Sequence, residues 1–137
     1  MSASDSYPAD EAARQQLRVL VDRHPGYAVV RVVGEVDVLT GDLLDERIND
    51  TLHAVPRRVV LDLREVGFFG ATGLRVLVAA RDTAWRLGVC LRLACTGRAV
   101  LMPLTLTGLL GEFDIYPDPR SALARPHQAA RPACPTG

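Results

Sequence analysis

The spacing of apolar residues changes along the chain between short-range alternation and a helical repeat, which predicts strands and helices in turn. Runs rich in β-branched and other apolar residues predict strands at 17–22, 27–34, 57–63, 89–94 and 113–116. The turn residues His24-Pro25-Gly26 separate the first two runs, so these strands can form a hairpin. The run Val59-Val60-Leu61 predicts a central strand that is buried on both faces.

Apolar residues that recur every three or four positions predict helices at 42–55, 72–87 and 98–107. Thr40 is expected to be the N-cap of the first helix, whose apolar face would end at Val55. Helix 72–87 is the most regular, and the turn residue Gly88 follows it. A final helix is expected to start at Asp118-Pro119.

Strands that alternate with helices predict an α/β fold with a mixed sheet and helices packed on it. We expect a single domain with four to five strands and about four helices, in which right-handed crossovers join parallel neighbours. The domain is expected to span residues 17–124. The polar segment 1–16 and the Pro/Ala-rich segment 125–137 are expected to be disordered tails.

Charge and hydropathy narrow the possible functions. The formal net charge is zero, whereas a dedicated nucleic-acid binder needs an excess of basic charge. No apolar stretch is long enough to span a membrane, and the polar, acidic N-terminus is unlike a signal peptide. We therefore expect a cytoplasmic protein that binds neither nucleic acid nor membrane. Arginine supplies every basic side chain and lysine is absent, which is typical of a GC-rich bacterial genome.

Catalytic and metal-binding chemistry is not indicated. The histidines fall in a turn (His24), on the polar side of a helix (His53) and in the C-terminal segment (His127), with no Ser–His or Cys–His arrangement. The three cysteines lack the CxxC spacing of zinc sites and suggest no disulfide framework. Cys90 and Cys95 are interpreted as small core residues. We expect no enzyme activity, no metal and no cofactor.

The segment Gly67-Phe-Phe-Gly70-Ala-Thr-Gly73 is glycine-rich and leads into a helix. It lacks the Gly-Lys-Ser/Thr ending and the GxGxxG spacing of nucleotide-binding loops. Glu35 and Asp37 follow a strand where it meets a helix. They form either a solvated turn, in which Asp37 bonds local amides, or a polar lip beside the Gly70 turn.

Several segments occur in the order found in one known family: Val32-Val-Gly-Glu-Val-Asp37, Val59-Val-Leu-Asp-Leu63, Val66-Gly-Phe-Phe-Gly-Ala-Thr-Gly-Leu74, Leu106-Thr-Gly-Leu109 and Phe113-Asp-Ile-Tyr-Pro117. On these motifs the sequence resembles STAS domains, the domains of anti-sigma factor antagonists, over about residues 17–123. The predicted order of elements agrees with the fold of that family.

The resemblance implies a bacterial regulator of transcription that works by partner switching. Such an antagonist binds an anti-sigma factor, usually a serine kinase, and thereby releases a sigma factor for a stress or development regulon. The kinase switches the antagonist off by phosphorylating the Ser of an Asp-Ser-Ser/Thr-Gly motif at a helix N-terminus, where phosphate is tolerated. The resemblance implies no cofactor, and the protein is expected to be a monomer or a homodimer.

The chain departs from that motif at its central position. Gly70 stands where the family has Asp, Ala71 stands where it has the phosphorylated Ser, and Thr72-Gly73 match. Ala71 has no hydroxyl, so three readings stay open. The protein is an antagonist that this route cannot switch off, or Thr72 takes the phosphate, or the domain has lost the switch and serves as a scaffold. Thr72 is alternatively a helix cap.

The resemblance places the partner-binding site at two segments: Glu35, Asp37 and Thr40, and Gly70, Ala71, Thr72, Gly73, Leu74 and Arg75. Arg75 is either a solvated charge or a contact at the rim of the interface. Other functions within the family stay open, namely a non-catalytic STAS scaffold or a small-ligand-binding or lipid-binding subunit of a larger signalling assembly.

Overall fold

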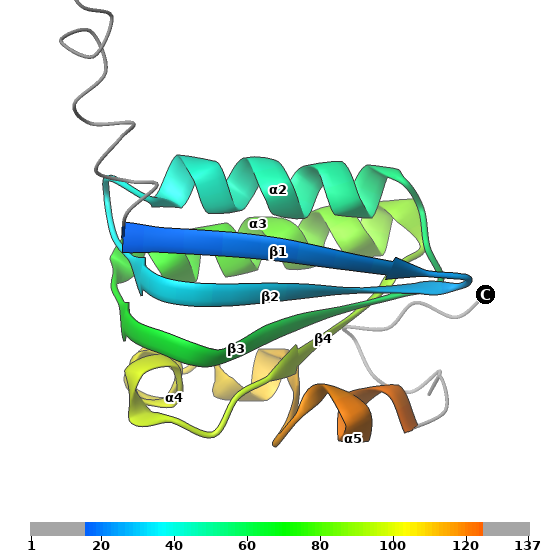
Figure 1. Ribbon diagram of the computed structural model, residues 1–137. Coiled ribbons are helices and arrows are strands. Elements are labelled where there is room, and N and C mark those ends of the chain that lie inside the picture. The colour runs from blue at the N-terminus through cyan, green and yellow to red at the C-terminus, as the bar shows by residue number, and fades with distance from the viewer. Residues whose placement is uncertain (1–15, 125–137) are drawn as a thin grey trace, which may run out of the picture.

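A computed structural model of the chain describes residues 16–124, and Figure 1 shows their arrangement. The segments 1–16 and 125–137, which are predicted to be tails, lie outside these residues, apart from Gln16. Five strands form one sheet in the order β1-β2-β3-β4-β5. They are β1 (Leu17–His24), β2 (Tyr27–Val36), β3 (Arg58–Phe69), β4 (Cys90–Ala94) and β5 (Asp114–Tyr116). β1 pairs with β2 antiparallel, and the other neighbours are parallel.

Helices connect the parallel strands and cover the sheet, as the alternating pattern predicts. They are α2 (Gly41–His53), α3 (Ala71–Leu87), α4 (Arg98–Leu106), the short 3-10 helix η2 (Leu110–Glu112) and α5 (Pro119–Ala124). Figure 1 shows α2 and α3 side by side on one face of the sheet, with α5 on the other. The α/β fold with a mixed five-stranded sheet is confirmed, and η2 is an addition to the predicted elements.

Helix α3 and strand β3 have the burial that their patterns predict. On α3 the apolar face is buried, whereas the opposite face, which carries Arg75 and Asp82, is exposed. Val59, Val60 and Leu61 of β3 are all fully buried. Val59 and Leu61 pack in the main core, and Val60 packs in the smaller cluster under α5. Strand β3 is therefore the centre of the fold, with apolar contacts on both sides.

Strand β3 is longer than its apolar run indicates, since it continues past Leu63 to Phe69. Its extension pairs with β2 up to its last residue, where Phe69 lies opposite Val36. The pairing shifts register in this stretch, so a simple alternation of apolar residues does not mark it. As a result β3 reaches the glycine-rich turn with no intervening loop.

Helix α2 is shorter than predicted and ends at His53. Val55 lies outside it, exposed, with a left-handed φ of 53°. The following Pro56 explains the early end, because a proline disfavours helical backbone in the residue before it. Val55 therefore does not extend the buried face of the helix.

The described residues also bear on membrane, metal and cysteine chemistry. None of their helices is sufficiently long and apolar to cross a membrane. Within residues 16–124, His, Cys, Asp and Glu side chains form no group of three that could hold a metal ion.

Cys90 and Cys95 are both buried, as expected for core residues. Cys95 is a free thiol, and Cys90 is disulfide-bonded, which the spacing of the cysteines did not indicate.

Candidate partner-binding site

The two predicted segments of the site meet at one end of the sheet. β2 and β3 are parallel and end side by side, with Glu35 opposite Phe68 and Val36 opposite Phe69. The backbone N–H of Gly70 donates a hydrogen bond to the carbonyl of Val36 at 3.1 Å. The fold thus brings the segment after β2 next to the Gly70 turn, although more than thirty residues separate them in sequence.

The N-termini of α2 and α3 are in direct contact at this end. A Cβ on Gly41, the first residue of α2, would overlap the Cγ2 methyl of Thr72 in the first turn of α3. Glycine at position 41 is therefore required for the close approach of the two helices. The unpaired N–H groups of both first turns lie at the same edge of the molecule.

Helix α3 starts one residue earlier than its periodicity predicts. Gly70 is its N-cap in an extended conformation, and the first helical hydrogen bond runs from the N–H of Leu74 to the carbonyl of Gly70. Thr72 is therefore the second helical residue, and the reading of it as a helix cap was wrong. Its side chain is half-buried and makes no hydrogen bond within residues 16–124. No acidic residue lies in this first turn, so the positive end of the helix dipole is not compensated there.

The glycine at position 73 fixes the turn against the core. A Cβ on Gly73 would lie 2.8–2.9 Å from three atoms of the Phe69 ring, which is buried. Leu74 is partly buried and also packs against the core. Gly73 and Leu74 thus hold the turn in place and offer little surface to a partner, whereas Ala71 and Arg75 are exposed.

Asp37 and Thr40 form a local hydrogen-bond network. The Asp37 carboxylate accepts from the N–H groups of Leu39 at 2.9 Å and Thr40 at 3.2 Å. The Thr40 hydroxyl donates to the Glu35 carbonyl at 2.8 Å and accepts from the Asp37 N–H at 2.9 Å. Asp37 thus bonds local amides, as one of the two readings predicts. Thr40 is the N-cap residue of α2, as predicted, although its side chain makes no capping hydrogen bond to the helix.

This network presents apolar side chains that sequence reasoning missed. Val38 is 82% exposed, Leu39 is 50% exposed, and Phe68, at the end of β3, is 51% exposed. A Cβ on Gly70 would lie 3.1 Å from the Phe68 ring, so this ring lies against the turn. Two features of the sequence could have indicated them. Val38 and Leu39 are an apolar pair in an otherwise polar turn, and the alternation of side chains along a strand directs Phe68 away from the face that buries Phe69. We define the turn surface by its exposed members: Glu35, Val38, Leu39, Phe68, Ala71 and Arg75.

Charge is sparse on the turn surface. Glu35 and Arg75 are its charged members, and neither forms an ion pair with another described residue. The other members are apolar. Such a composition, apolar with few charges, is typical of the core of a protein–protein interface.

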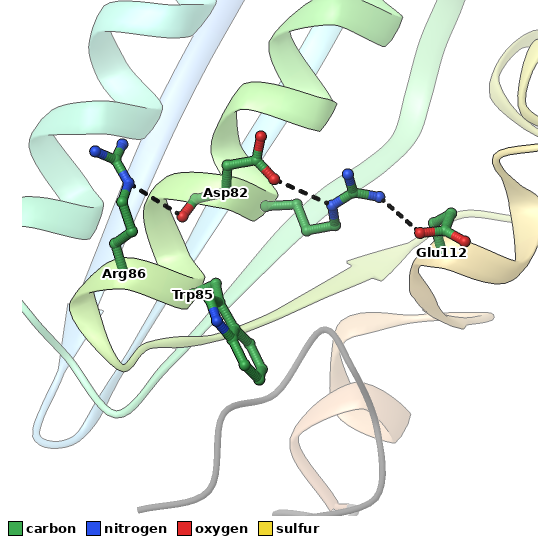
Figure 2. A pocket seen from close by; sticks show the side chains of 5 residues that line it. Asp82, Trp85, Arg86 and Glu112 are labelled. Atoms are coloured by element: carbon green, nitrogen blue, oxygen red, sulfur yellow. Dashed lines mark hydrogen bonds and ion pairs between the residues drawn. The ribbon is translucent and has the colours of Figure 1, made fainter.

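A separate shallow pocket lies along α3, around the exposed Trp85 (Figure 2). Arg81 contacts Asp82 at 3.5 Å and Glu112 at 3.0 Å, whereas Arg86 donates to the Asp82 carbonyl and the Thr83 hydroxyl and forms no ion pair with another described residue. Arg81 also lies over the Phe113 ring. The pocket contains none of the predicted site residues, so the turn surface is the stronger candidate.

The mixed sheet, the two helices on one face and the glycine turn at the start of α3 define a STAS domain. The sequence profile of the STAS domain family matches residues 18–122, and the chain belongs to that family. It is 32% identical over 115 residues to the anti-sigma-F factor antagonist RsfB of Mycobacterium tuberculosis (strain H37Rv), an alignment that covers 82% of this chain and 91% of the relative.

Solved structures give the same family. The crystal structure of an anti-sigma factor antagonist from Mycobacterium paratuberculosis is similar with a TM-score of 0.73 and 33% identity, and the match covers 79% of this chain and 92% of that one. The anti-sigma factor antagonist SpoIIAA in its unphosphorylated form is similar with a TM-score of 0.66 over 77% of this chain and 93% of that one. At 12% identity this second likeness concerns the fold alone.

Proposed function

We propose that this protein is an anti-sigma factor antagonist that binds a serine-kinase-type anti-sigma factor through the turn surface. Binding there competes with a sigma factor and frees it for transcription, without a cofactor and without catalysis by the antagonist. The observation that carries the proposal is the exposed turn surface at the N-terminus of α3, in which four of the six members are apolar. The named functions of its mycobacterial relatives support the same class of partner. The proposed place of action is the cytoplasm.

The turn surface is suited to binding because it is held in shape before a partner arrives. The network of Asp37 and Thr40 fixes the loop that carries Val38 and Leu39. Thr40 is buried, so we assign it a supporting role behind the contact residues. A preformed surface loses less conformational freedom on association, which favours affinity. Phe68 would be the central anchor, with Glu35 and Arg75 at the rim.

We further propose that the usual serine switch is closed in this protein. Ala71 is exposed at the position where a kinase would need a hydroxyl. Thr72 is a poorer acceptor, because it is half-buried and its methyl group packs over Gly41 of α2. Of the three readings, an antagonist that this route cannot inactivate fits the site best.

The decisive experiment measures binding to purified serine-kinase-type anti-sigma factors from the same genome by calorimetry. Ala71→Asp should weaken binding at least about tenfold, because a carboxylate would be desolvated in an apolar contact. It should not destabilise the fold, since an acid in the first helical turn is favourable. Ala79→Asp is the matched control, because Ala79 is exposed on the same helix two turns further along and should leave binding unchanged.

The switch has its own test in the same system. After incubation with the kinase and ATP, the intact mass of the wild type should not change, whereas Ala71→Ser should gain one phosphate. A phosphate on the wild type that disappears in Thr72→Ala would refute the closed switch. Unchanged binding of Ala71→Asp would show that the turn is not the interface. Failure to bind any such kinase, with assembly into large hetero-oligomers instead, would support the scaffold function.

A further inference from the structure

Strand β1 forms one edge of the sheet. It is eight residues long, contains no proline and keeps a regular register with β2 along its whole length. Among the described residues no element pairs with its outer side, and Figure 1 shows it beside β2 at the edge of the sheet. Natural proteins usually shorten, bulge or cover such edges to prevent pairing. β1 is neither shortened nor bulged, and its protection consists of the charged side chains Arg18, Asp22 and Arg23, so pairing requires a partner strand that matches these charges.

The hydrogen-bond pattern of the hairpin determines which groups of β1 face outward. His24 and Tyr27 flank a two-residue turn, so they exchange hydrogen bonds, and the pairs alternate from there. The backbone N–H and C=O groups of Leu20 and Asp22 are therefore hydrogen-bonded to β2. Val19, Val21 and Arg23 have their N–H and C=O groups directed away from it. A second strand can pair here only in a register that places these outward residues opposite one another.

One two-fold register satisfies that condition and also matches charge. If the two-fold axis passes between the two copies of Leu20, Val19 pairs with Val21 of the second copy, and Arg18 lies directly opposite its Asp22. Both Arg18–Asp22 pairs are then attractive. Shifting the register by two residues either way would place Arg18 opposite Leu20 or His24 instead. Arg18 has no ion-pair partner within residues 16–124, whereas Asp22 contacts only His24, at 2.9 Å.

Apolar burial favours the same pairing. Leu20 is 42% exposed at the centre of the edge and would meet its own counterpart. Val19 and Val21 pack against the core but are only partly buried, so a neighbouring strand would complete their burial. The edge is thus self-complementary in hydrogen bonds, in charge and in apolar contact.

We propose that β1 pairs with β1 of a second copy of this chain in this antiparallel register, which forms a homodimer with one continuous sheet. A two-fold interface uses the same patch on both copies, as the symmetry of this register requires. The turn surfaces lie at the carboxyl ends of β2 and β3 and remain free. Because the two copies run in opposite directions, the turn surfaces face opposite ends of the shared sheet. The proposal does not depend on the identity of the partner that binds there.

Charge reversal in the full chain tests the register, with sedimentation over a concentration series as the readout. Arg18→Asp and Asp22→Arg should each weaken self-association at least about tenfold, because both symmetry-related pairs become repulsive. The double variant should recover to within about threefold of the wild type, since it restores opposite charges. Arg98→Asp, an exposed reversal at the start of α4, is the control and should have no effect.

Amide hydrogen exchange of the wild type gives a second readout that does not depend on variants. The N–H groups of Val19 and Val21 should become protected as the protein concentration rises, while those of Leu20 and Asp22 should be protected throughout. A wild type that stays monomeric at millimolar concentration would overturn the proposal. The proposal would also be overturned if the double variant self-associates no more tightly than the single variants. A dimer in which the N–H groups of Val19 and Val21 stay unprotected from exchange would overturn it as well.

Discussion

Replacement of Gly73 by alanine tests whether the turn is held by its contact with Phe69. Helix propensity alone predicts that the change stabilises the protein by about 1 kcal/mol, because alanine is the better helix former. The structure predicts the opposite sign. The new Cβ would lie 2.8–2.9 Å from three ring atoms of Phe69, and the ring is buried with little room to turn away.

The size of the effect follows from the geometry. Carbon atoms in contact prefer a separation of about 3.5–4.0 Å, so the ring or the helix start must move by roughly 0.7 Å. Forced overpacking of this kind costs about 1–3 kcal/mol. After the gain in helix propensity, we expect a net loss of about 1 kcal/mol in the free energy of unfolding. In a domain of this size the melting temperature should fall by about 4 °C.

Urea denaturation of the wild type, Gly73→Ala, Phe69→Leu and the double variant measures this coupling. With the smaller leucine at position 69, Gly73→Ala should lose its penalty, and the cycle should give a coupling of about 1 kcal/mol or more. Gly67→Ala is the matched control, since nothing lies within 4 Å of a Cβ at that position. It should stabilise the strand by about 0.5–1 kcal/mol. Stabilisation by Gly73→Ala in the wild-type background would refute the reasoning.

Three further outcomes are expected. Thr40→Val keeps the side-chain shape but leaves the Glu35 carbonyl and the Asp37 N–H without their hydrogen-bond partner. Denaturation should therefore show a free energy of unfolding that is lower by about 1–3 kcal/mol. An unchanged stability would argue against the network. Val55→Gly should stabilise the protein by about 0.5 kcal/mol, because relief of the strain at the left-handed φ of Val55 outweighs the greater conformational entropy of glycine in the unfolded chain. A melting temperature at or below that of the wild type would contradict this. Burial raises the pKa of the Cys95 thiol from 9.0 to about 11, so maleimide at pH 8 should label this thiol far more slowly in the folded protein than in urea. The stability that the neutral thiol contributes should be lost as the pH rises from 9 to 11. Equal labelling rates in the folded protein and in urea would refute the burial.

The parts of the fold that sequence predicted well depend on local periodicity. Helix α3 is the clearest case, because its apolar stripe alone determines which face is buried. The buried run at Val59 to Leu61 is another, since continuous apolar character requires cover on both faces. The end of β3 was missed because pairing with β2, a contact distant in sequence, keeps its polar residues in the strand.

The proximity of the two candidate segments was predicted, but the contacts of their side chains were not. Thr40 is the N-cap residue that the sequence predicted, yet its hydroxyl bonds the backbone before the helix, which only the folded path of the loop decides. Val38 and Phe68 are apolar residues that point outward, and hydrophobic patterning assigns such residues to a core by default. Exposure of this kind depends on tertiary placement, so the sequence carries little signal for it.

The short connection between β3 and α3 has a thermodynamic consequence for any partner. Only Gly70 separates the strand from the helix, and its N–H is tied to the Val36 carbonyl. The turn therefore contains no flexible segment that would have to become ordered when a partner binds. Calorimetry of complex formation should give a negative heat-capacity change of the size expected from the apolar area covered, without the additional contribution that folding of a segment would bring.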